Sequence, residues 1–332
     1  MLRIPALALA CLISSSAFAD KAPTYGEQLE GFPSPYPVQH YALQSQGQAL
    51  QMGYLDVAPT AKANGRTMVL MHGKNFCAFT WEGSIKALAE AGYRVVAVDQ
   101  VGFCTSSKPA HYQYSFQQLA ENTSALLKQL KVDKAIVLGH STGGMLATRY
   151  ALMYPQQVER LAMVNPIGLE DWKALGVPYR TIDQWHAREL NLNAEGVRNY
   201  ERSTYYAGRW KPEYERWVQM LVGLNRGPGH AAVAWNSALI YDMIYTQPVV
   251  YEFKHLQMPT LLLIGDADTT AIGSDVAPPE VKARLGQYKV LGKQVIKDIP
   301  QGTLVEFPGL GHAPQIEAPT RFHQALLTWL EG

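Results

Sequence analysis

The stretch that decides the fold is Ala135-Ile136-Val137-Leu138-Gly139-His140-Ser141-Thr142-Gly143. An apolar run ends in the pattern G-x-S-x-G, and a run of helical character from Met145 to Ala151 follows it. A strand, a sharp turn and a helix in this order form a nucleophile elbow, whose turn lifts the serine hydroxyl clear of the backbone. Flanking glycines are needed because the turn brings backbone segments too close for side chains. The alternative is a glycine-rich turn with a buried, inert serine; the setting favours Ser141 as a nucleophile.

Composition limits the classes of function. The chain has 332 residues, enough for a core domain and one insertion, and a net charge of +1. Charged residues make up 17% of it, less than the usual quarter or so. Nucleic-acid binding would require a strong basic bias, which is lacking. We therefore expect a small-molecule partner, and the composition leaves the oligomeric state open.

The N-terminus has the pattern of a signal peptide over residues 1–19. A short basic segment, Met1-Leu2-Arg3, precedes the apolar run Ile4–Ser15 and the A-x-A cleavage site Ala17-Phe18-Ala19. The apolar run is shorter than the roughly 18 residues of a membrane span. A lipoprotein acylated at Cys11 is the alternative, but the residues before it fit a lipobox poorly. The pattern predicts cleavage after Ala19, export to the periplasm or the medium, and no stable membrane span in the mature chain.

Strand and helix patterns alternate along most of the chain. After an extended arm (20–37), the expected strands are 38–45, 49–57, 67–71, 93–98, 135–138, 161–165, 260–265 and 303–307. The expected helices are 81–91, 115–130, a helix after the elbow to about 154, 281–299 and 320–330. Continuous apolar strands that alternate with helices predict an α/β fold with a mostly parallel eight-stranded sheet and helices on both faces.

The alternation stops after Pro166 and resumes near Met258. Residues 167–257 are helical in pattern and hold five of the seven tryptophans, namely Trp172, Trp185, Trp210, Trp217 and Trp235. We interpret this segment as an inserted helical cap, with residues 20–166 and 258–332 forming the core. An aromatic cap suggests a largely apolar pocket, with Tyr205, Tyr206 and Trp210 as candidate lining residues. The alternative is that these aromatic side chains fill the interior of the cap.

A serine nucleophile needs a base within hydrogen-bond reach and an acidic group that orients the base. His312 lies in the glycine-rich loop Gly309–Pro314, between the last strand and the last helix. Asp268 lies just past a strand end, where a loop faces the ligand side of a parallel sheet. Asp266 competes for this role, but it directly follows the terminal glycine of the strand and suits a turn-capping role better.

The other histidines near these motifs suit structural roles. His72 and His140 each belong to a turn motif, His323 falls inside the last helix, and His111 lies in a polar loop.

Acyl transfer also needs N–H donors for the tetrahedral oxyanion. The backbone N–H of Lys74 or Asn75, after the strand that ends at His72-Gly73, can pair with the N–H of Thr142. The alternative is a plain strand-exit loop. The Lys74 side chain is unusual there, and the sequence leaves open whether it points to solvent or favours anionic substrates.

With these motifs in place, the chain resembles an α/β-hydrolase of the group of capped esterases, dehalogenases and epoxide hydrolases, over about Val38–Glu331. The matching pieces are His72-Gly73 with Trp81, Asp99-Gln100-Val101-Gly102 with Ser106-Ser107-Lys108-Pro109, Gly139–Gly144, Gly265 with Asp268, and Gly311-His312. The resemblance implies Ser141 as nucleophile, Asp268 as acid and His312 as base. Dehalogenases and epoxide hydrolases use aspartate at the elbow, so the serine argues against those two branches.

One departure from the family concerns Cys104, where a glycine is common. In the family fold the loops after His72 and Asp99 lie side by side, with Cys77 in one and Cys104 in the other. The resemblance therefore implies a disulfide between them, which an oxidising compartment permits. Two separate buried thiols are the alternative.

The function that we expect is an exported serine hydrolase that cleaves carboxylic esters with an apolar portion through an acyl-enzyme. A lactonase, an amidase or peptidase, and a C–C bond hydrolase would use the same residues. A binding protein on the same fold is the alternative from another class, although such proteins usually lack a triad residue. The chemistry needs no metal and no organic cofactor.

Overall fold

A computed structural model describes residues 23–332. The predicted signal peptide and its cleavage site at Ala19 lie outside the described residues. Within residues 23–332, no helix is both long enough and apolar enough to cross a membrane.

The centre of the molecule is one eight-stranded sheet with the order β1-β2-β4-β3-β5-β6-β7-β8. The strands are β1 (Gln39–Ser45), β2 (Gln48–Val57), β3 (Thr67–Met71), β4 (Arg94–Val98), β5 (Ala135–His140), β6 (Val158–Val164), β7 (Thr260–Gly265) and β8 (Gly302–Phe307). Strands β1 and β2 form an antiparallel hairpin, β2 pairs antiparallel with β4, and the other strand pairs are parallel. The predicted fold class is confirmed.

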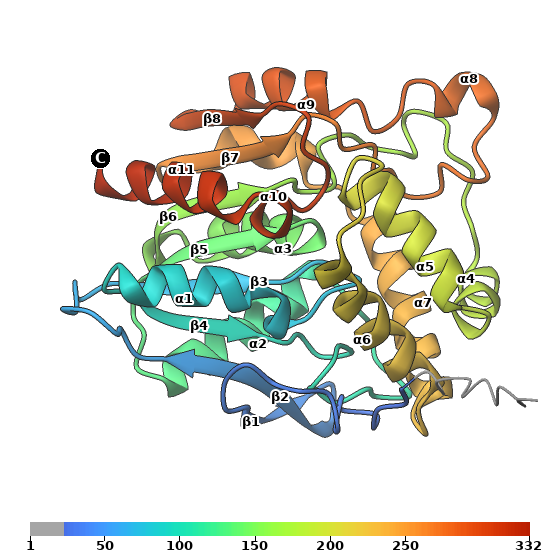
Figure 1. The fold of residues 1–332 in the computed structure, drawn as a ribbon, viewed down its shortest axis with the longest axis horizontal. Helices are drawn as coiled ribbons and strands as arrows, with labels where there is room; N and C mark the ends of the chain where they lie inside the picture. The colour runs from blue at the N-terminus through green and yellow to red at the C-terminus, as the bar shows by residue number, and fades with distance from the viewer. Residues whose placement is uncertain (1–22) are drawn as a thin grey trace, which may run out of the picture.

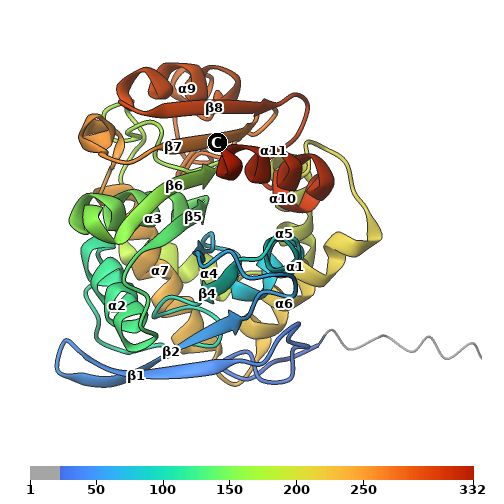
Figure 2. The same ribbon diagram turned by 90° about the vertical axis from the view of Figure 1, so that its left-hand side faces the viewer.

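Helices cover both faces of the sheet. The core helices are α1 (Glu82–Glu90), α2 (Phe116–Gln129), α3 (Thr142–Met153), α8 (Pro279–Lys282), α9 (Tyr288–Val295), α10 (Pro314–Glu317) and α11 (Pro319–Glu331). Helices α1, α10 and α11 lie on one face, and α2, α3 and α9 lie on the other (Figure 2). Every residue of β5 and β7 is buried between these layers, which explains the continuous apolar runs of those strands.

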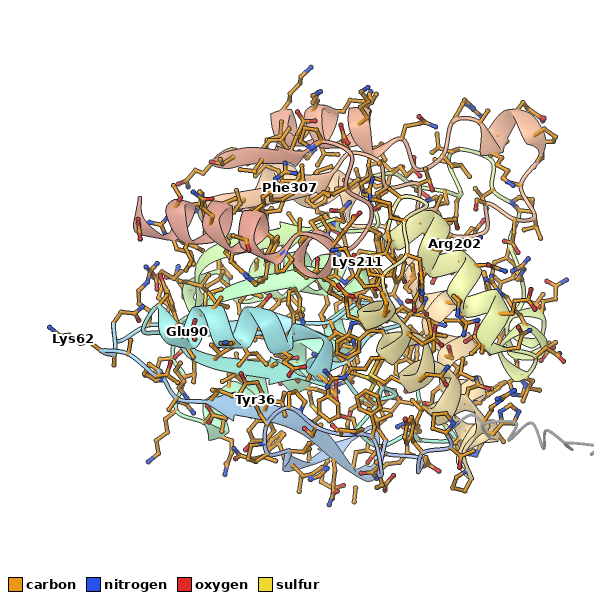
Figure 3. All side chains as sticks on the ribbon, viewed as in Figure 1. Tyr36, Lys62, Glu90, Arg202, Lys211 and Phe307 are labelled. Carbon is orange, nitrogen blue, oxygen red and sulfur yellow. A yellow bond between two sulfur atoms is a disulfide. The ribbon has the colours of Figure 1, made fainter. Side chains whose placement is uncertain are left out.

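The segment between β6 and β7 lies beside the carboxyl ends of the parallel strands (Figure 1). We call residues 167–257 the cap. Its elements are α4 (Ile182–Leu190), α5 (Ala194–Tyr200), the π-helix η3 (Glu201–Tyr205), η4 (Pro212–Tyr214), α6 (Glu215–Arg226), α7 (His230–Thr246) and η5 (Val250–His255). Figure 3 shows side chains filling the space between the cap and the strand ends, whereas Lys62 projects from the opposite edge. The cap therefore covers the edge of the sheet at which Ser141 follows β5.

The expected single helix over 281–299 is wrong. The structure has α8, a break, α9 and the short helix η6 (Ile296–Asp298) instead. Gly286 lies in the break with a φ of +63°, and a Cβ on it would come within 2.6 Å of the Thr269 carbonyl oxygen. The chain bends there because it passes directly against the backbone that follows Asp268, a contact that periodicity does not reveal.

The N-terminal arm is not simply extended. It contains turns, and its Leu29 and Phe32 side chains are buried. The Tyr25 N–H donates to the carbonyl oxygen of Gly223 in α6 at 2.9 Å. The arm therefore ties the edge of the core to the cap.

Candidate active site

Ser141 is held in a strained turn between β5 and α3. Its φ of 57° and ψ of −121° are unusual for a residue with a side chain. A Cβ on Gly139 would lie 2.1 Å from the carbonyl oxygen of Gly143, and a Cβ on Gly143 would lie 2.1 Å from that of Met71. Both flanking glycines are therefore required by close backbone contacts, as expected for an elbow.

The start of α3 and the loop after β3 carry backbone N–H groups without backbone acceptors among the described residues. Thr142 is the first residue of α3, so its N–H has no acceptor inside the helix. The loop after β3 turns through a hydrogen bond from the Phe76 N–H to the Gly73 carbonyl oxygen, at 3.1 Å. Within residues 23–332, neither the Lys74 N–H nor the Asn75 N–H makes a backbone hydrogen bond, so both predicted donors on this loop are available. Parallel pairing of β3 with β5 brings the two loops together, because Met71 pairs with Gly139.

His312 and Asp268 form a buried pair. Nδ1 of His312 lies 2.6 Å from Oδ2 of Asp268, and both side chains are essentially inaccessible to solvent. Nδ1 therefore donates, which leaves Nε2 able to accept a proton. Nε2 of His312 is buried and has no hydrogen-bond partner among the described residues. A general base must lie within hydrogen-bond reach of the proton that it takes, and among residues 23–332 no hydrogen bond joins Nε2 to the Ser141 hydroxyl.

The Asp268 carboxylate is saturated with donors. Oδ2 also accepts from Nδ2 of Asn165 at 2.9 Å. Oδ1 accepts from the backbone N–H of Thr270 at 2.8 Å and from its hydroxyl at 2.7 Å. Sequence reasoning missed Asn165 and Thr270. The available signal for Asn165 was its position directly after β6, the strand next to β5.

Asp266 has the turn role expected of it. Its Oδ1 accepts a hydrogen bond from the Gly309 N–H at 2.6 Å and so ties the loop after β7 to the loop that carries His312. This contact makes Asp266 a support for the loop and leaves Asp268 beside the imidazole.

The nearby histidines are neutral and make structural hydrogen bonds between loops. Nδ1 of His72 lies 2.8 Å from the Gly73 carbonyl oxygen, while its Nε2 accepts from the Gln100 N–H. Nε2 of His140 lies 2.9 Å from the His312 carbonyl oxygen, which joins the elbow to the His312 loop. Burial lowers the pKa of both side chains, so neither imidazole carries charge near neutral pH. His323 contacts Ser84 across α11 and α1, and His111 is exposed.

The comparisons with known proteins agree with the fold. A family model described as the alpha/beta hydrolase fold matches residues 66–319. The chain belongs to the alpha/beta hydrolase family.

Individual relatives are hydrolases as well. A probable hydrolytic enzyme from Pseudomonas aeruginosa PAO1, known from its crystal structure, is 70% identical with a TM-score of 0.92, over 92% of this chain and 98% of that chain. The putative carbamate hydrolase RutD of Serratia proteamaculans is 26% identical over 272 residues, 80% of this chain and 90% of that protein. Bifunctional epoxide hydrolase 2 of Sus scrofa is 36% identical over 124 residues, 35% of this chain, and the match spans only 22% of that protein.

The π-helix η3 brings the cap of this alpha/beta hydrolase against its His312 loop. The carbonyl oxygens of Thr204 and Tyr205 accept hydrogen bonds from the N–H groups of His312 and Ala313, at 3.1 and 3.3 Å. A Cβ on Gly311 would lie 2.4 Å from the Tyr205 carbonyl oxygen, so the backbones are in direct contact. The position of the histidine thus depends on the cap as well as on the sheet.

The candidate pocket aromatics have different positions. Tyr205 lies beside the site, since its hydroxyl accepts from Nδ2 of Asn75 at 3.0 Å and its ring centroid is 4.9 Å from that of His312. Tyr206 instead stacks on Tyr214 at 3.6 Å, and Trp210 packs against both rings. Tyr206 therefore belongs to the interior of the cap, and the half-buried Trp210 packs against it, which is the alternative that the sequence left open.

Two cavities near the site have walls that sequence reasoning missed. One of about 210 Å³ reaches Asn75, and one of about 430 Å³ reaches Thr204 and Thr269. Arg188, Tyr200 and Tyr241 line both cavities. These residues lack a distinctive motif in the sequence, and only the packing of α4, α5 and α7 brings them together.

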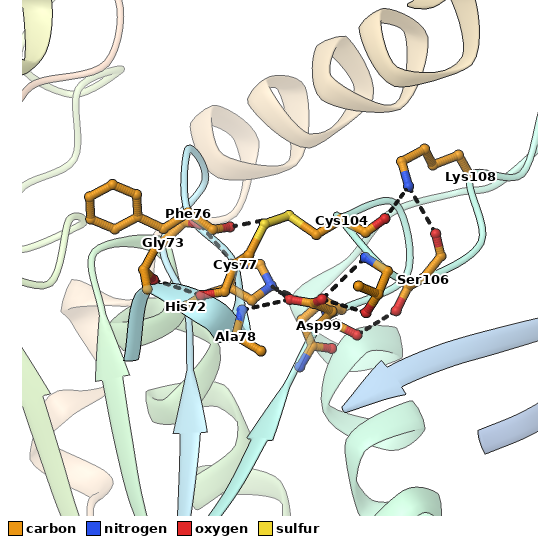
Figure 4. Close-up of a disulfide and its surroundings, with 12 residues drawn as sticks. His72, Gly73, Phe76, Cys77, Ala78, Asp99, Cys104, Ser106 and Lys108 are labelled. Carbon is orange, nitrogen blue, oxygen red and sulfur yellow. Dashed lines mark hydrogen bonds and ion pairs between the residues drawn. A yellow bond between two sulfur atoms is a disulfide. The ribbon is translucent and has the colours of Figure 1, made fainter. Parts of the chain in front are cut away.

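A disulfide joins Cys77 to Cys104, as the resemblance implied. The Cα atoms are 6.0 Å apart, and the bond links the loops after β3 and β4 (Figure 4). The Asp99 carboxylate holds the same two loops, since it accepts from the N–H groups of Ala78 at 2.7 Å and Thr105 at 3.1 Å. Cys77, Asp99 and Cys104 are close enough to share a metal ion, but the two sulfurs are bonded to each other.

A buried lysine completes this junction. Nζ of Lys108 donates to the carbonyl oxygens of Cys104 and Ser106, at 2.7 and 3.0 Å (Figure 4). Burial lowers the pKa of Lys108 to about 8, and the negative charge of Asp99 partly opposes this shift. The loop that carries Cys104 is thus held by a covalent bond, a carboxylate and an ammonium group.

Removing the disulfide should lower stability without abolishing the fold. The bond spans 27 residues of sequence, and a loop of that size corresponds to about 3.5 kcal/mol in the chain-entropy treatment. We expect Cys77→Ala/Cys104→Ala to unfold in urea with a free energy about 3.5 kcal/mol below that of the wild type. Denatured mature wild type should show no free thiol, and reductant should leave the double variant unaffected. Two titratable thiols in the wild type would contradict the disulfide.

The cap also contains a buried acid, Glu201, at the start of η3. It is inaccessible to solvent, and neither carboxyl oxygen has a hydrogen-bond partner within residues 23–332. Burial, with a smaller contribution from Glu215, raises the pKa of Glu201 to about 8. The carboxyl is therefore protonated near neutral pH.

Glu201 should make stability depend on pH. Its folded-state pKa of about 8 exceeds the ordinary 4.5, so its stabilising contribution is complete below pH 4.5 and is lost as pH rises through 8. The side chain of Glu201→Gln cannot ionise. As pH rises from 4.5 to 9, the free energy of unfolding of the variant should therefore increase relative to that of the wild type by about 3–5 kcal/mol.

Urea unfolding of both proteins at several pH values measures this difference. Asp275→Asn is the control, because Arg180 and Arg188 outweigh burial and leave the pKa of Asp275 lowered, so its contribution to stability changes only below about pH 4. Parallel curves for wild type and Glu201→Gln would show that the carboxyl does not titrate in this range.

Proposed function

We propose that this alpha/beta hydrolase is an exported serine hydrolase that cleaves carboxylic esters. The observation that carries the proposal is the buried His312, which donates to Asp268 through Nδ1 and has an unpartnered Nε2, at the edge of the sheet where Ser141 stands in its strained turn. A serine, a free imidazole nitrogen and an orienting carboxylate are the parts of an acyl-transfer site.

The reaction follows from these positions. Ser141 Oγ attacks the ester carbonyl while Nε2 of His312 takes its proton, and the N–H groups of Thr142 and Lys74 hold the oxyanion. His312 then returns the proton to the leaving alcohol, and an acyl-enzyme remains. Water attacks the acyl carbonyl with its proton passing to His312, and the acid leaves as Ser141 regains its proton. Asp268 stays ionised throughout, stabilised by Asn165 and Thr270.

Substrate size is suggested by the cavities under the cap. Their walls combine aromatic rings with polar groups, and the two larger cavities meet at Arg188 and Tyr241. A third cavity of about 40 Å³, between Phe76, Phe103 and the cap residue Leu224, is largely apolar. Neither Ser141 nor His312 lines any of the three, so these cavities describe the space beside the site, and their small volumes make short esters the first substrates to test.

Hydrolysis of p-nitrophenyl esters from acetyl to palmitoyl, with a lactone and an anilide alongside, tests the chemistry. We expect activity on the shorter esters and a loss of about 10⁴-fold or more in Ser141→Ala. Ser124→Ala is the control, because this serine lies on α2 against Gln157. Fluorophosphonate should label the wild type and Ser124→Ala but not Ser141→Ala.

The result of this series separates the alternatives. Preference for the lactone or the anilide would replace esterase by lactonase or amidase with the same residues. A folded wild type that neither turns over any substrate nor takes up fluorophosphonate would contradict a serine hydrolase and favour a binding protein.

Export is supported by the residue pattern of segment 1–19 and by a disulfide that an oxidising compartment would preserve. Expression of the full chain in a Gram-negative host should place the protein in the periplasm or the medium, with an N-terminal mass that begins at Asp20. A chain lacking residues 2–19 should remain in the cytoplasm and serves as the control. A full-length, uncleaved chain in the cytoplasm would contradict export.

A further inference from the structure

The Lys74 side chain neither reaches solvent nor stands free to bind an anionic substrate. Its Nζ lies 2.9 Å from Oε2 of Glu189 on α4, and it stands 3.9 Å from the ring centroid of Tyr241 on α7. The exposed fractions of the Lys74 and Glu189 side chains are 9% and 4%. A residue of the proposed oxyanion loop is therefore bound to two helices of the cap through a buried cation.

Glu189 is itself held on more than one side. Its Oε2 also accepts from the hydroxyl of Ser237 on α7 at 2.6 Å, and its carbonyl oxygen accepts from Nδ2 of Asn225 on α6 at 3.2 Å. Burial raises the pKa of Glu189, but Lys74 and the Ser237 hydroxyl outweigh burial and leave it lowered. The carboxylate is thus ionised and held by Ser237 of α7, while the backbone of Glu189 in α4 is tied to α6.

Stability alone is a weak reason for such a pair. Taking two charges out of water costs several kcal/mol per ion, and apolar side chains of similar volume are often as stabilising. An ion pair fixes the position of the two charged side chains more closely than apolar packing would. Nζ of Lys74 is fixed at one end, and the N–H proposed to bind the oxyanion belongs to the same residue. The neighbouring Asn75 is tied to Tyr205 of the cap in the same way.

We propose that Glu189 is a positioning residue that, through the Lys74 side chain, holds the Lys74 N–H in line with the developing oxyanion. The inference rests on the proposed function, and it adds that the cap helps to align the oxyanion site. Without the carboxylate, Lys74 loses its anchor on the cap and the donor loses its alignment.

The pair is tested with Glu189→Gln, Lys74→Met and the double variant Lys74→Met/Glu189→Met, using the best p-nitrophenyl ester. A donor displaced by about 1 Å can cost on the order of 100-fold in rate. We expect kcat of each variant to fall by about 10- to 100-fold with KM changed less than about threefold. The control is Arg216→Met, which removes another ion pair between cap and core, from α6 to Glu82 on α1, and should leave kcat unchanged.

The double variant separates alignment from folding. Because it leaves no unpaired buried charge, it should unfold at a temperature near that of the wild type. Its kcat should nevertheless remain low. Wild-type kcat in the double variant, or kcat within about twofold of wild type in a folded Glu189→Gln, would overturn the role of Glu189.

Failure of the proposed function has a different signature. If the wild type neither hydrolyses esters nor takes up fluorophosphonate, the serine hydrolase proposal falls and this inference falls with it. If the wild type is active and labelled while the Lys74 and Glu189 variants match it, only the inference about the ion pair is wrong.

Discussion

The structure depends on one close contact, in which the backbone of the elbow packs directly on the end of the neighbouring strand. A side chain on Gly143 would meet the Met71 carbonyl oxygen at 2.1 Å, so β3 and the elbow can approach only because that residue is glycine. This contact brings the loop after β3 beside the first turn of α3. Two backbone N–H groups from distant parts of the chain, at Lys74 and Thr142, are thereby placed near the same serine.

Hydrogen bonds centred on Asp268 organise the other half of the site. The carboxylate receives His312, Asn165 and Thr270, which follow three different strands of the sheet. Parallel strands make this possible because their carboxyl ends share one edge. The imidazole is left with a single free nitrogen, and its direction is set by groups that do not themselves meet the substrate.

The cap contributes to the site beyond covering it. Carbonyl oxygens of η3 hold the backbone of the His312 loop, while Glu189 and Tyr205 hold side chains of the oxyanion loop. Thr204 and Tyr205 are the last residues of η3, so their carbonyl groups have no donor inside the helix, and π-helical turns are frequent at functional sites. The cap thus contacts both loops on which the proposed chemistry depends.

The sequence by itself determined the strand–helix alternation, the elbow, the hairpin and the chain order of Ser141, Asp268 and His312, because these features follow from local periodicity, glycine geometry and motif spacing. It left open the direction of the Lys74 side chain, and it did not reveal the donors to Asp268, the break at Gly286 or the residues that line the cavities. These depend on segments far apart in the chain that meet only when the cap folds over the strand ends. Tertiary packing decided them, because a buried polar group takes whichever partner the fold brings within about 3 Å.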